Sequence, residues 1–208
     1  MNNTNARQSF GSFISHKLRR LSNEGGVPRL LEDEGLEGEQ ERDPDTAHPG
    51  LILSEGQKSV RDGEKTQALP NNPERFDTFG AVLGREGFPA GRHFWEVLVG
   101  SEGEWAVGVA RKSVRRKGGI TFSPEEGFWE VGKWGGRFRA SEKDPDPFEA
   151  LTRELKRIRV CLNYTGCRVA FFDADRAALL YEFCGASFSG ETLLPFFWLH
   201  SKGHLEIS

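Results

Sequence analysis

Short runs of alternating apolar and polar residues fill the chain from Leu51 to the C-terminus. Gly, Pro, Asn and Asp separate these runs at intervals typical of all-β proteins. We expect strands over residues 51–54, 59–61, 81–83, 93–99, 105–110, 119–122, 128–131, 137–140, 158–164, 168–173, 179–183, 194–199 and 205–207. The pattern predicts an all-β fold, a β-sandwich of two antiparallel sheets.

Two segments show the strand period most clearly. In Trp105–Ala110 large residues alternate with small ones, which predicts one face filling the core and another that a second layer can approach closely. In 158–164 every second residue is apolar, so these side chains point the same way. Thr165-Gly166 then predicts a turn into 168–172, which makes a hairpin. Three tryptophans within strand patterns are expected in the core: Trp95, Trp105 and Trp129.

Residues 1–41 differ from the rest of the chain in their pattern, and we expect them to form a flexible extension. Apolar residues recur at helical spacing within a basic stretch, which indicates a short amphipathic helix over about 9–22. Such a helix could dock on the following domain, touch an anionic membrane surface, or serve as a transit peptide. Residues 32–45 reverse the charge and predict an acidic linker. A brief helix is also expected over 148–156.

Composition restricts the class of protein. A net charge of -3 and a pI near 6.0 do not fit a nucleic-acid binder. The three cysteines, Cys161, Cys167 and Cys184, are too few for a disulfide framework and predict reduced thiols. The chain shows no apolar run long enough for a membrane span and no signal peptide. We expect a cytoplasmic monomer, with mitochondrial import and secretion as alternatives.

An ordered series of motifs carries a resemblance to a known family. The motifs are Asp43–Pro49, Leu51–Ser54, Ser59–Arg61, Pro73–Asp77, Val82–Gly84, Gly87-Phe88, Gly91–Val97, Trp105–Val109, Gly127–Trp129, Leu162–Tyr164, Val169–Phe172 and Leu194–Phe197. Together they resemble the PRY-SPRY domain of tripartite-motif proteins, butyrophilins and the venom vespryns. The resemblance implies a concanavalin-like jelly roll with short N-terminal helical elements. It also implies a PRY segment over 42–95 and a SPRY segment over 96–208, forming one folded unit.

The resemblance implies a protein–protein interaction module in innate immune or ubiquitin-linked pathways. Arg42 stands where the family often has Leu, and Asn163 and Thr165 depart from its Leu-Asp-Tyr-Glu motif. Residues 1–41 contain no Cys and no heptads, so the RING, B-box and coiled coil of tripartite-motif ligases are not expected. The chain is then the bare module or a fragment of a longer product. A sensor of a phosphorylated small molecule and a vespryn-like secreted protein are the alternatives.

The sequence offers little for catalysis, and we expect no enzyme, no cofactor and no metal. None of the motifs G-x-S-x-G, H-E-x-x-H and C-x-x-C occurs. His200 and His204 are four residues apart, but they follow a strand pattern, which favours a surface pair over a metal pair.

Trp134 is the leading candidate for a partner-binding residue. It lies between glycines and charges in 131–138, and exposed Trp and Arg are favoured at interaction hot spots. The alternative is a Trp lying flat over the sandwich as a lid on the core. The other candidates for this surface are Lys133, Arg137, Arg139, Trp198 and His200.

The basic run 111–117 has three interpretations. It can be a solvated connection after a strand, a nuclear-import signal, or part of an anion-binding pocket. By resemblance to the basic pocket of butyrophilin intracellular domains, the pocket would comprise His93, Lys112, Arg116 and Arg137 or Arg139. Arginine suits bidentate contact with phosphate.

Overall fold

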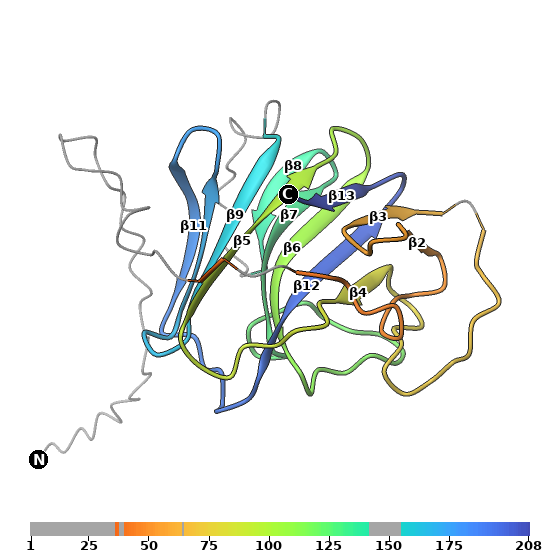
Figure 1. Cartoon of the computed structure of the whole chain (residues 1–208), viewed down its shortest axis with the longest axis horizontal. Coiled ribbons are helices and arrows are strands. Elements are labelled where there is room, and N and C mark those ends of the chain that lie inside the picture. The colour runs from red at the N-terminus through yellow and green to blue at the C-terminus, as the bar shows by residue number, and fades with distance from the viewer. Residues whose placement is uncertain (1–35, 38–39, 64, 142–154) are drawn as a thin grey trace, which may run out of the picture.

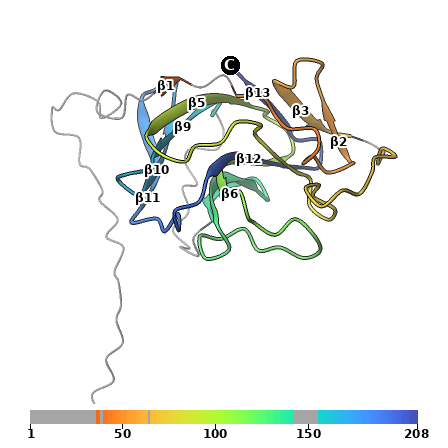
Figure 2. The same cartoon turned by 60° about the horizontal axis from the view of Figure 1, so that its bottom comes forward.

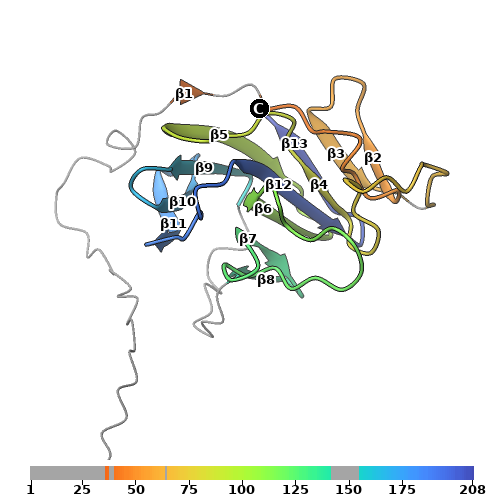
Figure 3. The same cartoon turned by 90° about the horizontal axis from the view of Figure 1, so that it is seen from below.

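Two sheets packed face to face form the protein, and they confirm the predicted sandwich (Figures 1 and 3). The structure is a computed structural model that describes residues 36–37, 40–63, 65–141 and 155–208. The eight-stranded sheet contains β1 (Leu36–Glu37), β2 (Leu51–Leu53), β3 (Ser59–Asp62), β5 (Arg92–Val99), β9 (Arg157–Asn163), β10 (Arg168–Asp173), β11 (Ala178–Cys184) and β13 (His204–Ile207). The five-stranded sheet contains β4 (Ala81–Leu83), β6 (Glu104–Arg111), β7 (Phe128–Trp134), β8 (Arg137–Ala140) and β12 (Leu193–His200).

The last two strands tie the early part of the chain to the rest. β12 lies between β4 and β6, and β13 lies between β3 and β5. Each of these two C-terminal strands is therefore hydrogen-bonded on both sides to strands that lie much earlier in the chain. Because both sheets contain strands from the two predicted segments, those segments share one core.

The core between the sheets follows the predicted alternation. Trp95, Trp105 and Trp129 are 1%, 2% and 1% exposed, which confirms that they are core residues. Along β6, Val107 and Val109 join the same cluster as Trp105. The alternate residues of β9 do so as well, so both strands chosen for their period lie as expected.

The paired part of the chain begins upstream of the predicted start at residue 42. β1 runs parallel to β5, with Leu36 in register with His93. Arg42 is fully buried, and its guanidinium donates to Lys58 O at 2.5 Å while lying 4.4 Å from the centre of the Phe197 ring. The departure from the family's Leu is therefore a buried cation held by backbone oxygen and an aromatic ring.

One predicted strand is wrong. Residues 119–122 form part of the loop between β6 and β7, and their apolar side chains pack onto a sheet instead of pairing in one. The predicted helix over 9–22 lies outside the described residues, as does most of the helix expected over 148–156. The described residues include no helix of the length and hydropathy needed to cross a membrane.

Candidate functional site

The candidate site lies on the outer face of the five-stranded sheet, which is the face turned away from the eight-stranded sheet. Strand alternation places the second set of β6 side chains there, namely Ala106, Gly108 and Ala110. Aromatic residues of neighbouring strands, including Phe128 and Phe196, lie on the same face. As predicted from the small residues of β6, a second layer approaches this face closely.

That second layer is the covering loop, residues 112–127, drawn in green below β6 in Figure 2. Phe122 meets Phe128 and Phe196 with ring centroids 5.1 and 5.2 Å apart. Phe79, from the segment before β4, contacts Phe122 at 5.3 Å. The loop therefore buries the part of the outer face that lies near the end of β6.

At the other end of the outer face, aromatic side chains form what we call the aromatic ledge: Trp134, Trp198 and His200. Trp134 and Trp198 stack with centroids 6.0 Å apart and planes inclined by 28°. His200 stacks on the opposite side of the pair, 6.1 Å from Trp198. Trp198 is 8% exposed, Trp134 is half-buried and His200 is exposed, so the ledge rises from the core to the surface.

Small residues leave the space in which the two indoles pack on the sheet. Trp198 is in register with Ala106 on β6, and Ala106 is in register with Gly132 on β7. A Cβ on Gly132 would lie 2.8 Å from the indole of Trp134. Trp134 therefore lies flat over the sheet, as in the lid interpretation, while its half-burial leaves part of the ring accessible, as the binding interpretation requires.

A tight hairpin fixes Trp134 beside a basic strand. Gly135 and Gly136 have φ of 56° and 75°, as a type I′ turn requires at both central positions. The turn is held by Glu104, whose Oε1 accepts the N–H of Gly135 at 2.7 Å. The hairpin sets Arg137 opposite Trp134.

The six predicted partner-binding residues come from the β7–β8 hairpin and the end of β12. Arg137 and Arg139 are exposed, and Arg139 is in register with Gly132, beneath the Trp134 ring. Lys133 lies on the same hairpin but donates from Nζ to Ser101 O at 2.6 Å. The structure thus brings Trp134, Trp198, His200 and the two arginines to one end of the outer face, and ties Lys133 to a neighbouring loop.

One buried group on this face is not predictable from the sequence. Glu130 is 1% exposed, and its Oε2 has no hydrogen-bond partner among the residues that the structure describes. Burial raises the pKa of this carboxyl to about 8. A glutamate in the middle of a strand indicates a position exposed to solvent. Glu130 is instead shielded from solvent, because the outer face of its sheet is covered. The packing of Phe122 is not predicted either, because the pattern of 119–122 indicates a strand.

The four candidate anion-binding residues do not converge. Lys112 follows β6, whereas Arg137 lies on the hairpin beside the start of β6. β6 spans eight residues, so at about 3.3 Å per residue its ends are roughly 23 Å apart. His93 Nε2 lies 2.7 Å from Ala90 O, and the His93 ring stacks on Phe88.

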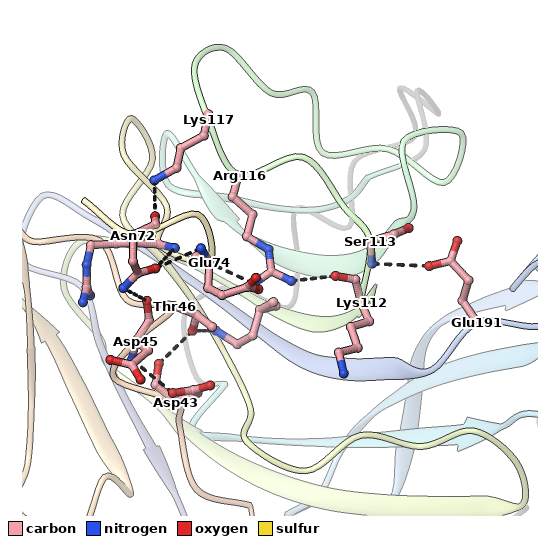
Figure 4. A network of polar contacts seen from close by, with 12 residues as sticks. Asp43, Asp45, Thr46, Asn72, Glu74, Lys112, Ser113, Arg116, Lys117 and Glu191 are labelled. Carbon is pink, nitrogen blue, oxygen red and sulfur yellow. Dashed lines mark hydrogen bonds and ion pairs between the residues drawn. The ribbon is translucent and has the colours of Figure 1, made fainter. Parts of the chain in front are cut away.

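The guanidinium of Arg116 is already bound to other residues of the protein (Figure 4). It is 7% exposed and donates to Lys112 O at 2.6 Å and to Glu74 O at 3.1 Å, with an ion pair to Glu74 Oε2 at 3.2 Å. Lys117 Nζ donates to Asn72 O at 2.7 Å. Arg116 and Lys117 of the basic run therefore hold the covering loop against the segment before β4.

Metal-ligand chemistry finds little support in the ranges that the structure describes. No group of three or more His, Cys, Asp or Glu side chains is placed there to hold an ion. His204 lies 3.9 Å from Glu206 Oε2, whereas His200 stacks on Trp198. Cys161 is buried, Cys167 half-buried and Cys184 exposed, and no disulfide joins these three described cysteines.

Known proteins share this fold. The structure is similar to the TRIM65 PSpry domain, with a TM-score of 0.70 and 20% identity over 90% of this chain and 98% of that one. It is also similar to stonustoxin, with a TM-score of 0.66 and 24% identity over 83% of this chain and 29% of that one. At these identities the likeness concerns the fold alone.

Sequence comparison identifies the family. Bovine butyrophilin subfamily 1 member A1 is 45% identical over 77% of this chain and 30% of its own length, and rat E3 ubiquitin-protein ligase TRIM11 is 41% identical over 82% and 36%. The chain spans about a third of these relatives, and the shared part is a protein-interaction module. The SPRY-associated domain, PRY, matches residues 43–88, and the SPRY domain matches residues 92–208. The chain therefore belongs to the PRY-SPRY family.

Proposed function

We propose that the aromatic ledge is the surface through which this PRY-SPRY domain recognises a protein partner. The observation that carries the proposal is the stacked pair of Trp134 and Trp198, half-open to solvent and bordered by Arg137 and Arg139. Interaction hot spots are enriched in Trp and Arg, placed where a partner can exclude water around them.

The sheet beneath the ledge supports this proposal. Trp134 and Trp198 lie on strands paired through β6, and the Gly135-Gly136 turn is held by Glu104. A ring that is fixed before binding loses little conformational freedom when a partner covers it. A large apolar side chain of the partner would then gain contact with the indoles at small entropic cost.

The pathway is also part of the proposal. One relative is named an E3 ubiquitin-protein ligase, and we propose that this chain supplies recognition in a ubiquitin-linked or innate immune setting. The chain would act in the cytoplasm as a monomer. The basic-pocket sensor gains no support, because its four residues do not form one cluster.

Affinity capture with the full chain tests the proposal. Proteins retained by the wild type are compared with those retained by Trp134→Ala and by Leu179→Ala, a control on β11 whose leucine is 38% exposed. We expect the ledge variant to lose its partner and the control to keep it. A partner retained equally by both variants would place the binding surface elsewhere.

A further inference from the structure

The side chains around the aromatic ledge carry an uneven charge. Arg139 is exposed, and its guanidinium makes no hydrogen bond or ion pair to any residue that the structure describes. It stands on the outer face next to Gly132, over which Trp134 lies. Arg137 is exposed on the same strand, in register with Trp134. Two guanidinium groups therefore border one side of the ledge.

Arg139 is paired with none of the carboxyl groups that the structure describes. Glu104 Oε1 already accepts the backbone N–H of Gly135. Glu130 is buried, and because burial raises its pKa to about 8, it is mostly uncharged at neutral pH. Among the residues that the structure describes, Arg139 therefore leaves a positive charge at the border of the ledge.

We infer that the aromatic ledge takes an acidic peptide segment of its partner, one that places an Asp or Glu carboxylate beside a large apolar side chain. The inference rests on the proposed function and adds the chemistry of the partner. The apolar side chain would lie against Trp134 and Trp198, and the carboxylate would accept hydrogen bonds from Arg139. Arginine binds a carboxylate through two parallel N–H···O bonds, which fixes orientation as well as adding attraction.

A basic segment fits the same surface poorly. Tryptophan faces attract cations, yet a Lys or Arg of the partner would approach Arg137 and Arg139 while Glu130 is buried and uncharged. Like charges brought together at an interface lower affinity and suppress such partners. The charge of the border therefore decides between the two classes of peptide.

Selection from a display library of short random peptides tests the inference. The immobilised full chain is the target, and the selected peptides are then measured against Trp134→Ala, Arg139→Ala and Arg61→Ala. Arg61 is an exposed arginine on β3, in the other sheet, and serves as the matched control. We expect Asp or Glu to be enriched within a few residues of Trp, Phe or Leu.

The variants distinguish a failure of the inferred acidic peptide from a failure of the proposed binding surface. Arg139→Ala should weaken the selected peptides about tenfold, the effect of losing one charge-assisted contact, and Arg61→Ala should leave them unchanged. Peptides that need Trp134 but lack acidic residues, or that ignore Arg139→Ala, would overturn the inference and leave the proposed function standing. Failure to select any peptide that needs Trp134 would overturn both.

Discussion

Trp134 stacks on Trp198 from a different strand, with ring centroids 6.0 Å apart, and only Trp198 is almost fully buried. Trp198 belongs to the apolar cluster beneath the covering loop, and Trp134 packs against that cluster from its border. The two tryptophans therefore differ in role although they touch. Trp198 anchors the sheet, and Trp134 extends its surface towards solvent.

This difference predicts unequal losses of stability. Trp134→Ala should lower the free energy of unfolding by about 1–2 kcal/mol, the range for an aromatic pair and part of a ring. Trp198→Ala should cost about 3–5 kcal/mol, because it leaves a cavity in the cluster. Urea denaturation of both variants measures the two values. Equal losses would mean that Trp134 is a core residue and would remove the main support for the binding surface.

Glu130 predicts a pH dependence of stability. The folded protein holds the Glu130 proton up to about pH 8, whereas the unfolded chain releases it near 4.5. Between these values the folded state binds more protons, so the free energy of unfolding falls as pH rises, by at most about 1.4 kcal/mol per unit. Above pH 8 both states are ionised and this contribution levels off.

Glu130→Gln should remove that component, because a neutral amide replaces the carboxyl. Stability of the variant, measured by urea denaturation at several pH values, should fall less steeply between pH 5 and 8. Glu126→Gln changes an exposed glutamate on the covering loop and should keep the wild-type slope. Identical slopes in the wild type and Glu130→Gln would show that Glu130 is solvated.

The contrast between Val109 and Glu130 shows how far the sequence leads. Alternation predicted that Val109 faces the core, and it does, because a strand has only two faces. The same alternation sends Glu130 outward, where solvent would be expected. The outer face is covered at this point, and Glu130 is 1% exposed. Whether a loop folds back over a sheet depends on tertiary contacts, which a local pattern does not contain.

The candidate site was predictable in part for a similar reason. Trp134 stood out because glycines and charges surround it, and the hairpin follows from Gly135-Gly136. Arg116 could not be separated from its basic neighbours. Both of its hydrogen-bond acceptors, beside the ion pair to Glu74 Oε2, are backbone carbonyls, those of Glu74 and Lys112, and every residue supplies a carbonyl. A sequence therefore shows the donor but not the partner that holds it.

Arg116 is accordingly predicted to contribute to stability. Arg116→Ala should lower the free energy of unfolding by about 2–3 kcal/mol, because two charge-assisted hydrogen bonds are lost. The covering loop should become more susceptible to limited proteolysis. Lys112→Ala removes an exposed side chain from the same basic run and should change stability by less than about 0.5 kcal/mol.

The anion-pocket interpretation predicts a different outcome for the same variants. Titration of the full chain with inorganic diphosphate would release or absorb heat, and Arg116→Ala would abolish that heat without loss of stability. We expect no such pattern, because Arg116 is 7% exposed and its guanidinium is already bound. Heat that Arg116→Ala abolishes, with stability unchanged, would restore Arg116 to a ligand site.

The surroundings of Arg42 predict that an apolar residue can replace this buried cation. Two of its three acceptors have other donors: Gln57 O accepts the backbone N–H of Arg42 itself, and Lys58 O accepts that of Ile207. Burial lowers the pKa of Arg42, which reflects the cost of holding its charge away from water. Arg42→Leu, the residue common in the family, avoids that cost and should leave stability equal or higher.

Arg42→Ala is the matched contrast, because it removes the charge and also the volume that lies against Phe197. It should lower the free energy of unfolding by about 2–4 kcal/mol, and Arg61→Ala, at an exposed position on β3, should change it little. Urea denaturation ranks the three variants. A larger loss in Arg42→Leu than in Arg42→Ala would show that the guanidinium stabilises the fold by its charge. The hydrogen bond to Lys58 O would then outweigh the cost of burial.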